Sequence, residues 1–211
     1  MYRNYVKRGL DFFIALVASP FVILVVIIMA PFIFWEDKGP VFYNATRRGM
    51  NGKEFKMFKL RSMYVNSPDL KNADGSTYNS ANDPRVTNIG RFMRKTSIDE
   101  IPQILNVLIG DMSFIGPRPT LVKTPYEKLE PNQKKRLEVR PGITGYAQAY
   151  YRNSITQNEK FKYDCEYIEK LSFAMDVKIL LKTISSVLKR QNIYVAKDEN
   201  SIVESEEKKQ K

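Results

Sequence analysis

The chain has 211 residues, a formal net charge of +11, one cysteine and no histidine, and this length fits one domain plus an appendage. The missing histidine removes the commonest general base and transition-metal ligand, and the lone Cys165 excludes internal disulfides and cysteine-rich zinc sites. Any catalysis would therefore use carboxylates, lysine, arginine, hydroxyls or a hard metal held by oxygen, and the positive charge favours a phosphate-bearing partner.

The first expected element is the uncharged segment from Phe12 to Trp35, which has 24 residues. As one helix it would be about 36 Å long, enough to cross a hydrocarbon core of about 30 Å. It is too long for a cleaved signal peptide, and no small-residue cleavage site follows it. Ser19 and Pro20 lie within it, and Pro31 lies near its end. They predict either a tolerated kink or a break that turns the chain back to the side from which it entered.

Basic residues on both sides of the apolar segment favour the second alternative. Arg3, Lys7 and Arg8 precede the segment, which indicates a cytoplasmic N-terminus. The residues that follow are also strongly basic, and a re-entrant hairpin would keep both flanks inside. Nucleic-acid binding would explain the charge but not the apolar segment, so we expect no nucleic-acid partner.

A β-hairpin is expected next. Val41–Tyr43 and Phe55–Arg61 are predicted as short strands, and the residues from Arg47 to Gly52 are predicted as the turn because they contain an Asn-Gly pair. Lys59 and Arg61 are expected to point to the same face of their strand, where they could serve a phosphate or simply face solvent. Residues 64–82 are predicted as a long loop that a turn at Asp83-Pro84-Arg85 closes.

Three helices are expected in the rest of the chain. The first is Ile98–Gly110, with glycine as its stop, and the second is Pro125–Glu138, with a basic outer side formed by Lys134, Lys135 and Arg136. The third is Leu171–Arg190, whose apolar stripe either faces the core or, because basic residues flank it, lies on a membrane surface. That stripe consists of Val177, Leu180, Leu181, Ile184 and Leu188.

Adjacent carboxylates, Asp99 and Glu100, mark the start of the first predicted helix. One interpretation is a capping box, with Ser97 as the cap and Glu100 reaching back to it. Another places the cap at Asp99, because Pro102 then falls where its missing N–H costs nothing. In either case the helix start would suit a phosphate, and catalysis by the two acids remains open.

Two further motifs could bind an anion. The first is Gly116-Pro117-Arg118-Pro119, in which the prolines restrain the backbone around Arg118. The arginine would therefore lose less conformational entropy when it binds a phosphate. In the segment from Arg140 to Gly145, two glycines would allow the backbone to approach a ligand closely. An ordinary turn explains either motif equally well.

In their order along the chain and in their residues, these motifs resemble those of the bacterial sugar transferases, in particular the small monotopic phosphoglycosyl transferases. The resemblance covers roughly residues 5 to 185. The matching stretches are KRGLDFFIALVASP, FKMFKLRSM, DPRVTNIGRFMRKTSIDEIPQILNVLIGDMSFIGPRPTL, RPGITGYAQ and YDCEYIEKLSFAMDVKILLKT.

The resemblance implies an α+β fold, mainly helical with a small β-hairpin or sheet. A re-entrant membrane helix with its break at Ser19 and Pro20 would pack on a cytoplasmic catalytic domain that carries amphipathic helices at the membrane surface. The implied division is residues 1–38 for the membrane helix–break–helix, 39–196 for the catalytic domain and 197–211 for a charged tail. The tail's composition predicts disorder.

The resemblance also implies site residues. Asp99 would be the nucleophile and a ligand of Mg²⁺ (or Mn²⁺), and Glu100 would assist it. Lys59, Arg94 and Arg118 match positions expected to hold phosphate groups.

The implied reaction transfers a sugar-1-phosphate from a UDP-sugar to undecaprenyl or another polyprenyl phosphate, with release of UMP and a phosphosugar–aspartate intermediate. It would be the first membrane step of bacterial surface glycan or glycoprotein synthesis, at the cytoplasmic face of the inner membrane, with membrane lipid and downstream glycosyltransferases as candidate partners. One alternative is a glycosyltransferase that moves the sugar alone and releases UDP. Another is a non-catalytic, membrane-bound phosphate-binding module.

Overall fold

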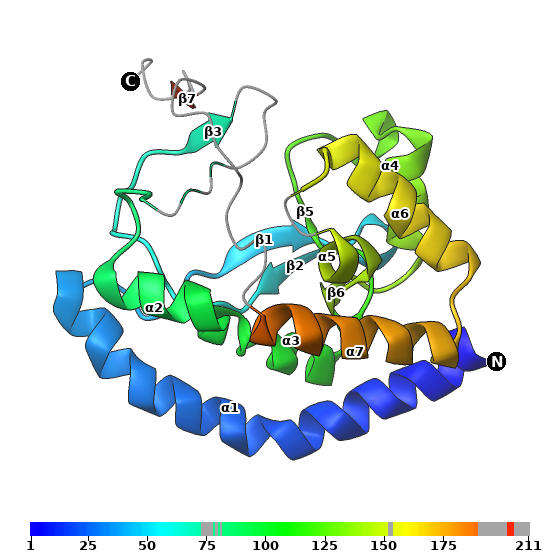
Figure 1. The fold of residues 1–211 in the computed structure, drawn as a ribbon, viewed down its shortest axis with the longest axis horizontal. Helices are drawn as coiled ribbons and strands as arrows, with labels where there is room; N and C mark the ends of the chain where they lie inside the picture. The colour runs from blue at the N-terminus through cyan, green and yellow to red at the C-terminus, as the bar shows by residue number, and fades with distance from the viewer. Residues whose placement is uncertain (73–77, 79, 81, 152–153, 190–201, 205–211) are drawn as a thin grey trace.

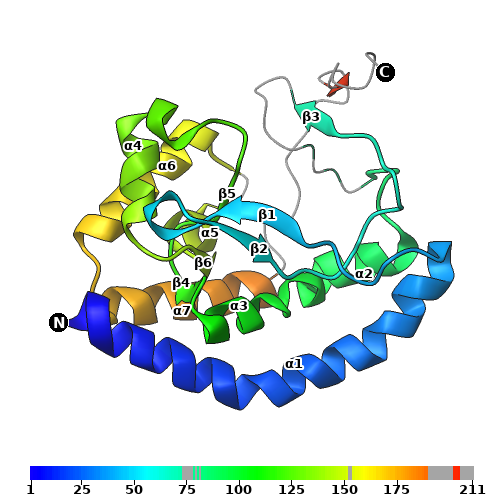
Figure 2. The same ribbon diagram turned by 180° about the vertical axis from the view of Figure 1, so that it is seen from behind.

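A computed structural model describes residues 1–72, 78, 80, 82–151, 154–189 and 202–204. The long helix α1 (Lys7–Asp37) follows a π-helical turn at Tyr2–Val6 and curves beneath the rest of the molecule (Figure 1). Its two ends rise toward the folded domain and its middle bows away, as the opposite view also shows (Figure 2). By length and composition α1 could cross a membrane.

The predicted interruption at Ser19 and Pro20 is absent, because α1 is one continuous helix that contains both Pro20 and Pro31. Pro20 has no N–H to donate to the carbonyl of Leu16, four residues earlier. The Ser19 hydroxyl donates to that same carbonyl at 2.8 Å. The serine thus satisfies the acceptor that the proline leaves without a partner, and the helix continues through this point.

The other elements form a mixed helix and sheet structure, as expected. The helices are α2 (Asn88–Thr96), α3 (Gln103–Ile109), α4 (Pro131–Lys135), α5 (Tyr146–Tyr150), α6 (Gln157–Glu169) and α7 (Phe173–Leu188). The strands are β1 (Ala45–Arg48), β2 (Glu54–Met57), β3 (Leu70–Asn72), β4 (Ser113–Ile115), β5 (Thr120–Leu121), β6 (Gly142–Thr144) and β7 (Ile202–Glu204). Short 3-10 turns occupy Met50–Gly52, Ile98–Glu100, Tyr126–Lys128 and Arg136–Glu138.

Small sheets connect these elements. An antiparallel sheet has the order β2-β1-β5, while β4 pairs with β6 in parallel and β3 pairs with β7 antiparallel. Helices α2, α3 and α7 lie between α1 and the β1–β2 hairpin (Figure 1). Apolar side chains join the layers: Ala15 of α1 packs with Phe55 and Met57 of β2 and with Val107 of α3.

The predicted hairpin is confirmed, with a shift in its first strand. Strand β1 begins at Ala45, and Val41–Tyr43 contributes only an isolated bridge between Phe42 and Leu60. Asn51 and Gly52 have φ values of 56° and 79°, the left-handed backbone that an Asn-Gly turn supplies. Arg47 and Arg48, expected in the turn, belong to β1.

Two predicted helices are broken into pieces. The stretch from Ile98 to Gly110 is a 3-10 turn followed by α3, and Pro125–Glu138 is α4 with a 3-10 turn on each side. Arg136 is buried rather than on a basic outer side, because it pairs with Asp164 of α6. The Asp83-Pro84-Arg85 turn is confirmed by a bond from the amide of Val86 to the carbonyl of Asp83.

The predicted third helix is confirmed as α7, which begins after its cap Ser172. Helices α2, α5 and α6 were not predicted. Of the segment predicted as a disordered tail, the structure describes only strand β7, and its other residues lie outside the described ranges. The long loop at 64–82 contains strand β3, and seven of its residues, 73–77, 79 and 81, are likewise outside them.

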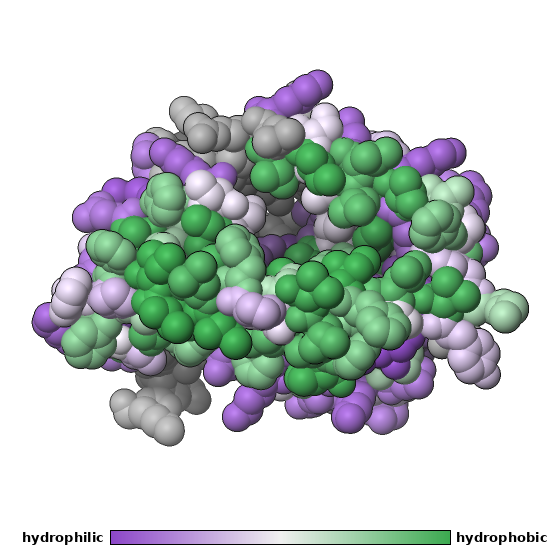
Figure 3. All heavy atoms as spheres, turned by 90° about the horizontal axis from the view of Figure 1, so that it is seen from below, coloured by the Kyte–Doolittle hydropathy of each residue, from purple (hydrophilic) through white to green (hydrophobic). Residues whose placement is uncertain are grey.

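Four residues of the apolar stripe of α7 are exposed: Val177, Leu180, Leu181 and Ile184. Leu181 is 62% exposed and Phe13 of α1 is 66% exposed. Seen from below, this face of the molecule is largely hydrophobic (Figure 3). A contiguous apolar surface of this kind marks an interaction with a membrane or a partner. Its largest exposed members include Val17, Phe21, Ile27, Phe32 and Trp35 on α1 and Phe173, Leu180 and Ile184 on α7.

Candidate active site

Asp99 and Glu100 lie in the 3-10 turn between α2 and α3, and neither caps a helix. Ser97 ends α2 in the left-handed conformation with φ 59°, its side chain makes no capping bond, and α3 begins only after Pro102. Both capping interpretations are therefore wrong. The reason is tertiary, because the carboxylates are drawn to cations from distant segments.

Lys59 and Arg118 are those cations. The ammonium of Lys59 lies 2.8 Å from Oδ2 of Asp99 and 3.2 Å from Oε1 of Glu100. Arg118 Nη2 donates to the same Glu100 oxygen at 3.0 Å. Asp99 is 2% exposed, whereas the side chain of Arg118 is 53% exposed. The cluster thus has a buried acid at its base and an accessible guanidinium at its edge.

The charges in this cluster shift each other's ionisation. Burial would raise the pKa of Glu100, but the charges of Arg118 and Lys59 outweigh burial and hold that pKa well below its ordinary value. Burial would lower the pKa of Lys59, and the two carboxylates raise it by more. The charge of Glu100 raises the pKa of Arg118. Glu100 is therefore ionised, and both bases stay positive, throughout the neutral range.

Asn106 holds the segment that carries Lys59 against α3. This buried amide accepts from the Phe58 amide at 2.8 Å and donates to the Lys56 carbonyl at 2.8 Å. One residue after Lys59, the Leu60 amide donates to the Asp99 carbonyl at 3.0 Å. These three bonds set the position of Lys59 relative to Asp99.

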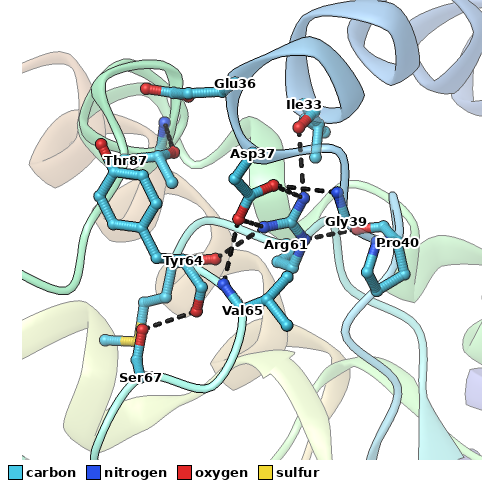
Figure 4. Close-up of polar contacts among 12 residues, drawn as sticks. Ile33, Glu36, Asp37, Gly39, Pro40, Arg61, Tyr64, Val65, Ser67 and Thr87 are labelled. Carbon is cyan, nitrogen blue, oxygen red and sulfur yellow. Dashed lines mark hydrogen bonds and ion pairs between the residues drawn. The ribbon is translucent and has the colours of Figure 1, made fainter.

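Arg61 does not join Lys59 at the cluster. Its guanidinium is bound to both carboxylate oxygens of Asp37, at 2.5 and 2.6 Å, and to the carbonyl of Ile33 at 3.2 Å (Figure 4). Asp37 also accepts from the Val65 amide at 3.0 Å. The interpretation of Arg61 as a phosphate ligand on the Lys59 face is wrong, because the end of α1 supplies a closer anion. Arg61 instead connects α1 to the segment of Lys59.

The turn that carries Arg118 is anchored through its backbone. Arg136 donates to the Arg118 carbonyl at 2.9 Å, and its Nε contacts Asp164 at 2.7 Å in a buried pair. The glycines nearby serve close packing: a Cβ on Gly142 would lie 2.1 Å from the Gly116 nitrogen, and one on Gly145 would lie 2.1 Å from the Gly116 oxygen. The close approach of the two loops accounts for these glycines. The prediction that the segment from Arg140 to Gly145 lets the backbone approach a ligand is therefore not required to explain them.

Arg94 lies on the last turn of α2, where its Nε donates to the Ser62 hydroxyl at 2.9 Å. Within the described ranges, no group of three or more His, Cys, Asp or Glu side chains is placed to hold a metal. Asp99 and Glu100 can offer Mg²⁺ two carboxylates, and Mg²⁺ commonly takes one or two carboxylates and completes its shell with water and substrate phosphates. The residues present fit such an ion.

The sequence interpretation missed Asn106, Asp37 and Arg136 as supports of the site. Asn106 is the one polar residue from Ile104 to Ile109, a signal that a buried partner exists. Asp37 is the second residue after the apolar run, where a charged residue needs no special reason. Arg136 follows two lysines and gives no local sign of burial.

The structure combines an apolar helix long enough to cross a membrane with a cluster of two acids and two bases, Lys59 and Arg118, of which Arg118 is exposed. The chain belongs to the bacterial sugar transferase family, whose model, described as "Bacterial sugar transferase", matches residues 2–190. The recognition from motifs is therefore confirmed.

Relatives with given names agree with this family. Galactosyl transferase CpsE of Streptococcus agalactiae is 43% identical over 190 residues, which cover 86% of this chain and 42% of that protein. The UDP-glucose:undecaprenyl-phosphate glucose-1-phosphate transferase of Escherichia coli is 39% identical over 189 residues, covering 86% and 40%. An uncharacterized sugar transferase of Bacillus subtilis, EpsL, is 43% identical over 155 residues, covering 73% of each chain. The chain spans about two fifths of the first two relatives.

Proposed function

We propose that this chain is a phosphoglycosyl transferase that moves a sugar-1-phosphate from a UDP-sugar to a polyprenyl phosphate and releases UMP. The observation that carries the proposal is the buried Asp99 carboxylate held 2.8 Å from the Lys59 ammonium, with Glu100 and Arg118 beside it. Relatives named as UDP-sugar:undecaprenyl-phosphate transferases supply the substrate classes.

The reaction has two balanced steps. An oxygen of Asp99 attacks the phosphorus that bears the sugar, the bond from that phosphorus to the bridging oxygen breaks, and UMP leaves with the electron pair. An oxygen of the polyprenyl phosphate then attacks the same phosphorus and expels the Asp99 carboxylate, which forms the polyprenyl diphosphate sugar. Donor and acceptor need not occupy the site together.

Each neighbour has a task in these steps. Lys59 offsets the repulsion between an anionic nucleophile and an anionic diphosphate, which is the main obstacle to phosphoryl transfer at a carboxylate. Glu100 holds Lys59 and Arg118 in place through one oxygen, and Arg118 presents an accessible guanidinium to the phosphates. Arg94 is expected to approach the same phosphates from α2. Mg²⁺ or Mn²⁺, held by Asp99 with help from Glu100, would supply further charge neutralisation when bound.

A re-entrant placement of α1 is the favoured membrane topology. Near the N-terminus Lys7 contacts Asp176 of α7 at 2.6 Å, and at the other end Asp37 contacts Arg61. Both ends of α1 are therefore tied to one domain, and a spanning helix would have to break one of these buried contacts. Because α1 is curved and its middle bows away from the domain (Figures 1 and 2), the middle of the helix would enter the lipid while the nucleophile stays at the depth of a lipid phosphate.

Product analysis tests the reaction class. The purified full chain is incubated with a panel of UDP-sugars, Mg²⁺ and undecaprenyl phosphate, and the released nucleotide is identified. We expect UMP. Release of UDP without UMP would identify a glycosyltransferase and would exclude the transfer of a sugar-1-phosphate.

A matched pair of variants tests the nucleophile. Asp99→Asn should abolish UMP release and the covalent phosphosugar adduct seen by mass spectrometry, with the folded state retained. Glu54→Gln, which removes an exposed carboxylate from β2, should leave both intact. Normal turnover by Asp99→Asn would show that Asp99 is not the nucleophile, and absence of turnover in the wild type would favour the non-catalytic phosphate-binding module.

A further inference from the structure

Arg47 is a second arginine beside the cluster, and the sequence interpretation placed it in a turn. It lies on β1 opposite Phe55 of β2 and opposite Leu121 of β5. Directly opposed residues of an antiparallel pair share a face, so Arg47 shares the face of Phe55, the one that packs on the core with α3. The register of the hairpin runs without a slip from Arg48 opposite Glu54 to Phe42 opposite Leu60.

Side chains on a strand alternate, so the face of Phe55 is also that of Lys59, four residues further along. About 13 Å separates these two positions along the strand. Arg118 is linked to both ends of this span. It contacts the Glu100 oxygen that Lys59 also contacts, it comes three residues before Leu121, the partner of Arg47, and its charge acts on Arg47. Lys59, Arg118 and Arg47 thus form one row of positive charge along the hairpin.

Arg47 has no anion of its own among the described residues. It is half-buried, and no hydrogen bond or ion pair joins its guanidinium to another described side chain. Burial, and then the charge of Arg118, lower the pKa of Arg47. A half-buried, unpaired guanidinium close to another guanidinium is costly in the free protein and becomes favourable only when an anion joins them.

We propose that Arg47 and Arg118 together bind the second phosphate of the donor, the one that leaves with the nucleoside. The proposal rests on the proposed function. The sugar-bearing phosphate would lie at Asp99 and Lys59, and the next phosphate would lie further along the row, between the two arginines. Two guanidinium groups can chelate one phosphate through paired hydrogen bonds. Arg47 is then a substrate-binding residue of the donor site.

Binding of UDP and UMP to the full chain in detergent tests this without any turnover. Arg47→Gln should weaken both nucleotides by about tenfold or more, since hydrogen bonds to charged groups are the stronger ones. It should raise the KM for the UDP-sugar similarly and leave the KM for undecaprenyl phosphate within about twofold. Lys56→Gln removes the same charge from the exposed opposite face of the hairpin and should change none of these values.

Stability provides a readout that separates binding from a structural role. Removing Arg47 relieves repulsion with Arg118, so the Tm of Arg47→Gln should be equal to or higher than that of the wild type. Arg47→Lys, which keeps the charge but loses the two-pronged geometry, should fold equally well and bind nucleotides with intermediate affinity. A lowered Tm in both variants would overturn the proposal in favour of a packing role.

The remaining outcomes are also decisive. Unchanged UDP and UMP affinity in Arg47→Gln overturns the proposal, and so does a selective rise in the KM for undecaprenyl phosphate, which would assign Arg47 to the acceptor. Loss of UDP affinity with UMP affinity retained would place Arg47 on the sugar-bearing phosphate instead. Because these titrations need no reaction, they stand apart from the UMP-release assay, whose failure would count against the proposed function alone.

Discussion

Asp37, the last residue of α1, and Arg61, two residues beyond Lys59, form a two-point ion pair with contacts of 2.5 and 2.6 Å. The neighbouring Glu36 accepts from the amides of Asn88 and Ile89 at the start of α2, at 2.5 and 3.2 Å. The end of the apolar helix is thereby attached to both segments that lead into the cluster. These contacts fix the end of α1 relative to the segments that carry Lys59 and Asp99.

Breaking the Asp37–Arg61 pair should destabilise the protein strongly. The two side chains are 14% and 7% exposed, so Asp37→Asn leaves a nearly buried charge without its partner. We expect a loss of about 3–5 kcal/mol in the free energy of unfolding, measured by denaturant titration in detergent. Glu166→Gln breaks the exposed pair with Lys170 and should cost about 0.5 kcal/mol or less. Equal losses in the two variants would contradict the role of Asp37.

Replacing the amide of Asn106 should loosen the segment of Lys59. Asn106→Leu keeps a similar volume but leaves the Phe58 amide and the Lys56 carbonyl without partners, which should cost about 1–3 kcal/mol for each group left unsatisfied. Asn88→Leu, which removes one exposed side-chain bond to Arg91, should change stability by about 0.5 kcal/mol or less. The kcat for UMP release should fall only in Asn106→Leu, and an unchanged kcat would mean that Lys59 is positioned by other contacts.

The bend in α1 should decide the membrane topology. In a Cys165→Ser background, single cysteines at Arg3 and Lys38 should both react only with reagent added from the cytoplasmic side. Ser19→Ala with Pro20→Ala restores the amide donor to Leu16, and the straightened helix of 31 residues would be about 46 Å long. In that variant a fraction of the Lys38 site should become reactive from the outside. Labelling from opposite sides in the unaltered helix would mean that α1 spans the membrane.

The depressed pKa of Glu100 sets the direction of a pH effect. An acid whose pKa is lower in the folded state stabilises the fold above its unfolded pKa, near 4.5 here, and loses that contribution as the pH falls toward the folded pKa. The difference in unfolding free energy between the wild type and Glu100→Gln should therefore be constant from pH 6 to 8 and shrink on acidification below about 4.5. A difference that grows on acidification would show that Glu100 is not held by Lys59 and Arg118.

The predictions from sequence were most accurate for features that interactions between neighbouring residues determine. The Asn-Gly pair produced the hairpin turn because positive φ is required there, with Asn51 at 56°. The apolar period of α7 placed that helix within two residues at each end. The prediction failed at Val41–Tyr43 and at Arg47, where strand pairing with Leu60 and Phe55 depends on a partner that local composition does not reveal.

For this chain the sequence by itself determined the long apolar segment, the absence of histidine and disulfides, the hairpin turn and the family. Only the tertiary structure decided that Asp99 and Glu100 face cations instead of capping a helix, and that Lys59 and Arg61, two residues apart, serve different anions. It also decided that Arg136 is buried and that Arg47 stands unpaired in the described part of the chain beside Arg118. The reason is that a charge takes its partner from whatever packing brings close, and here the partners come from segments tens of residues away.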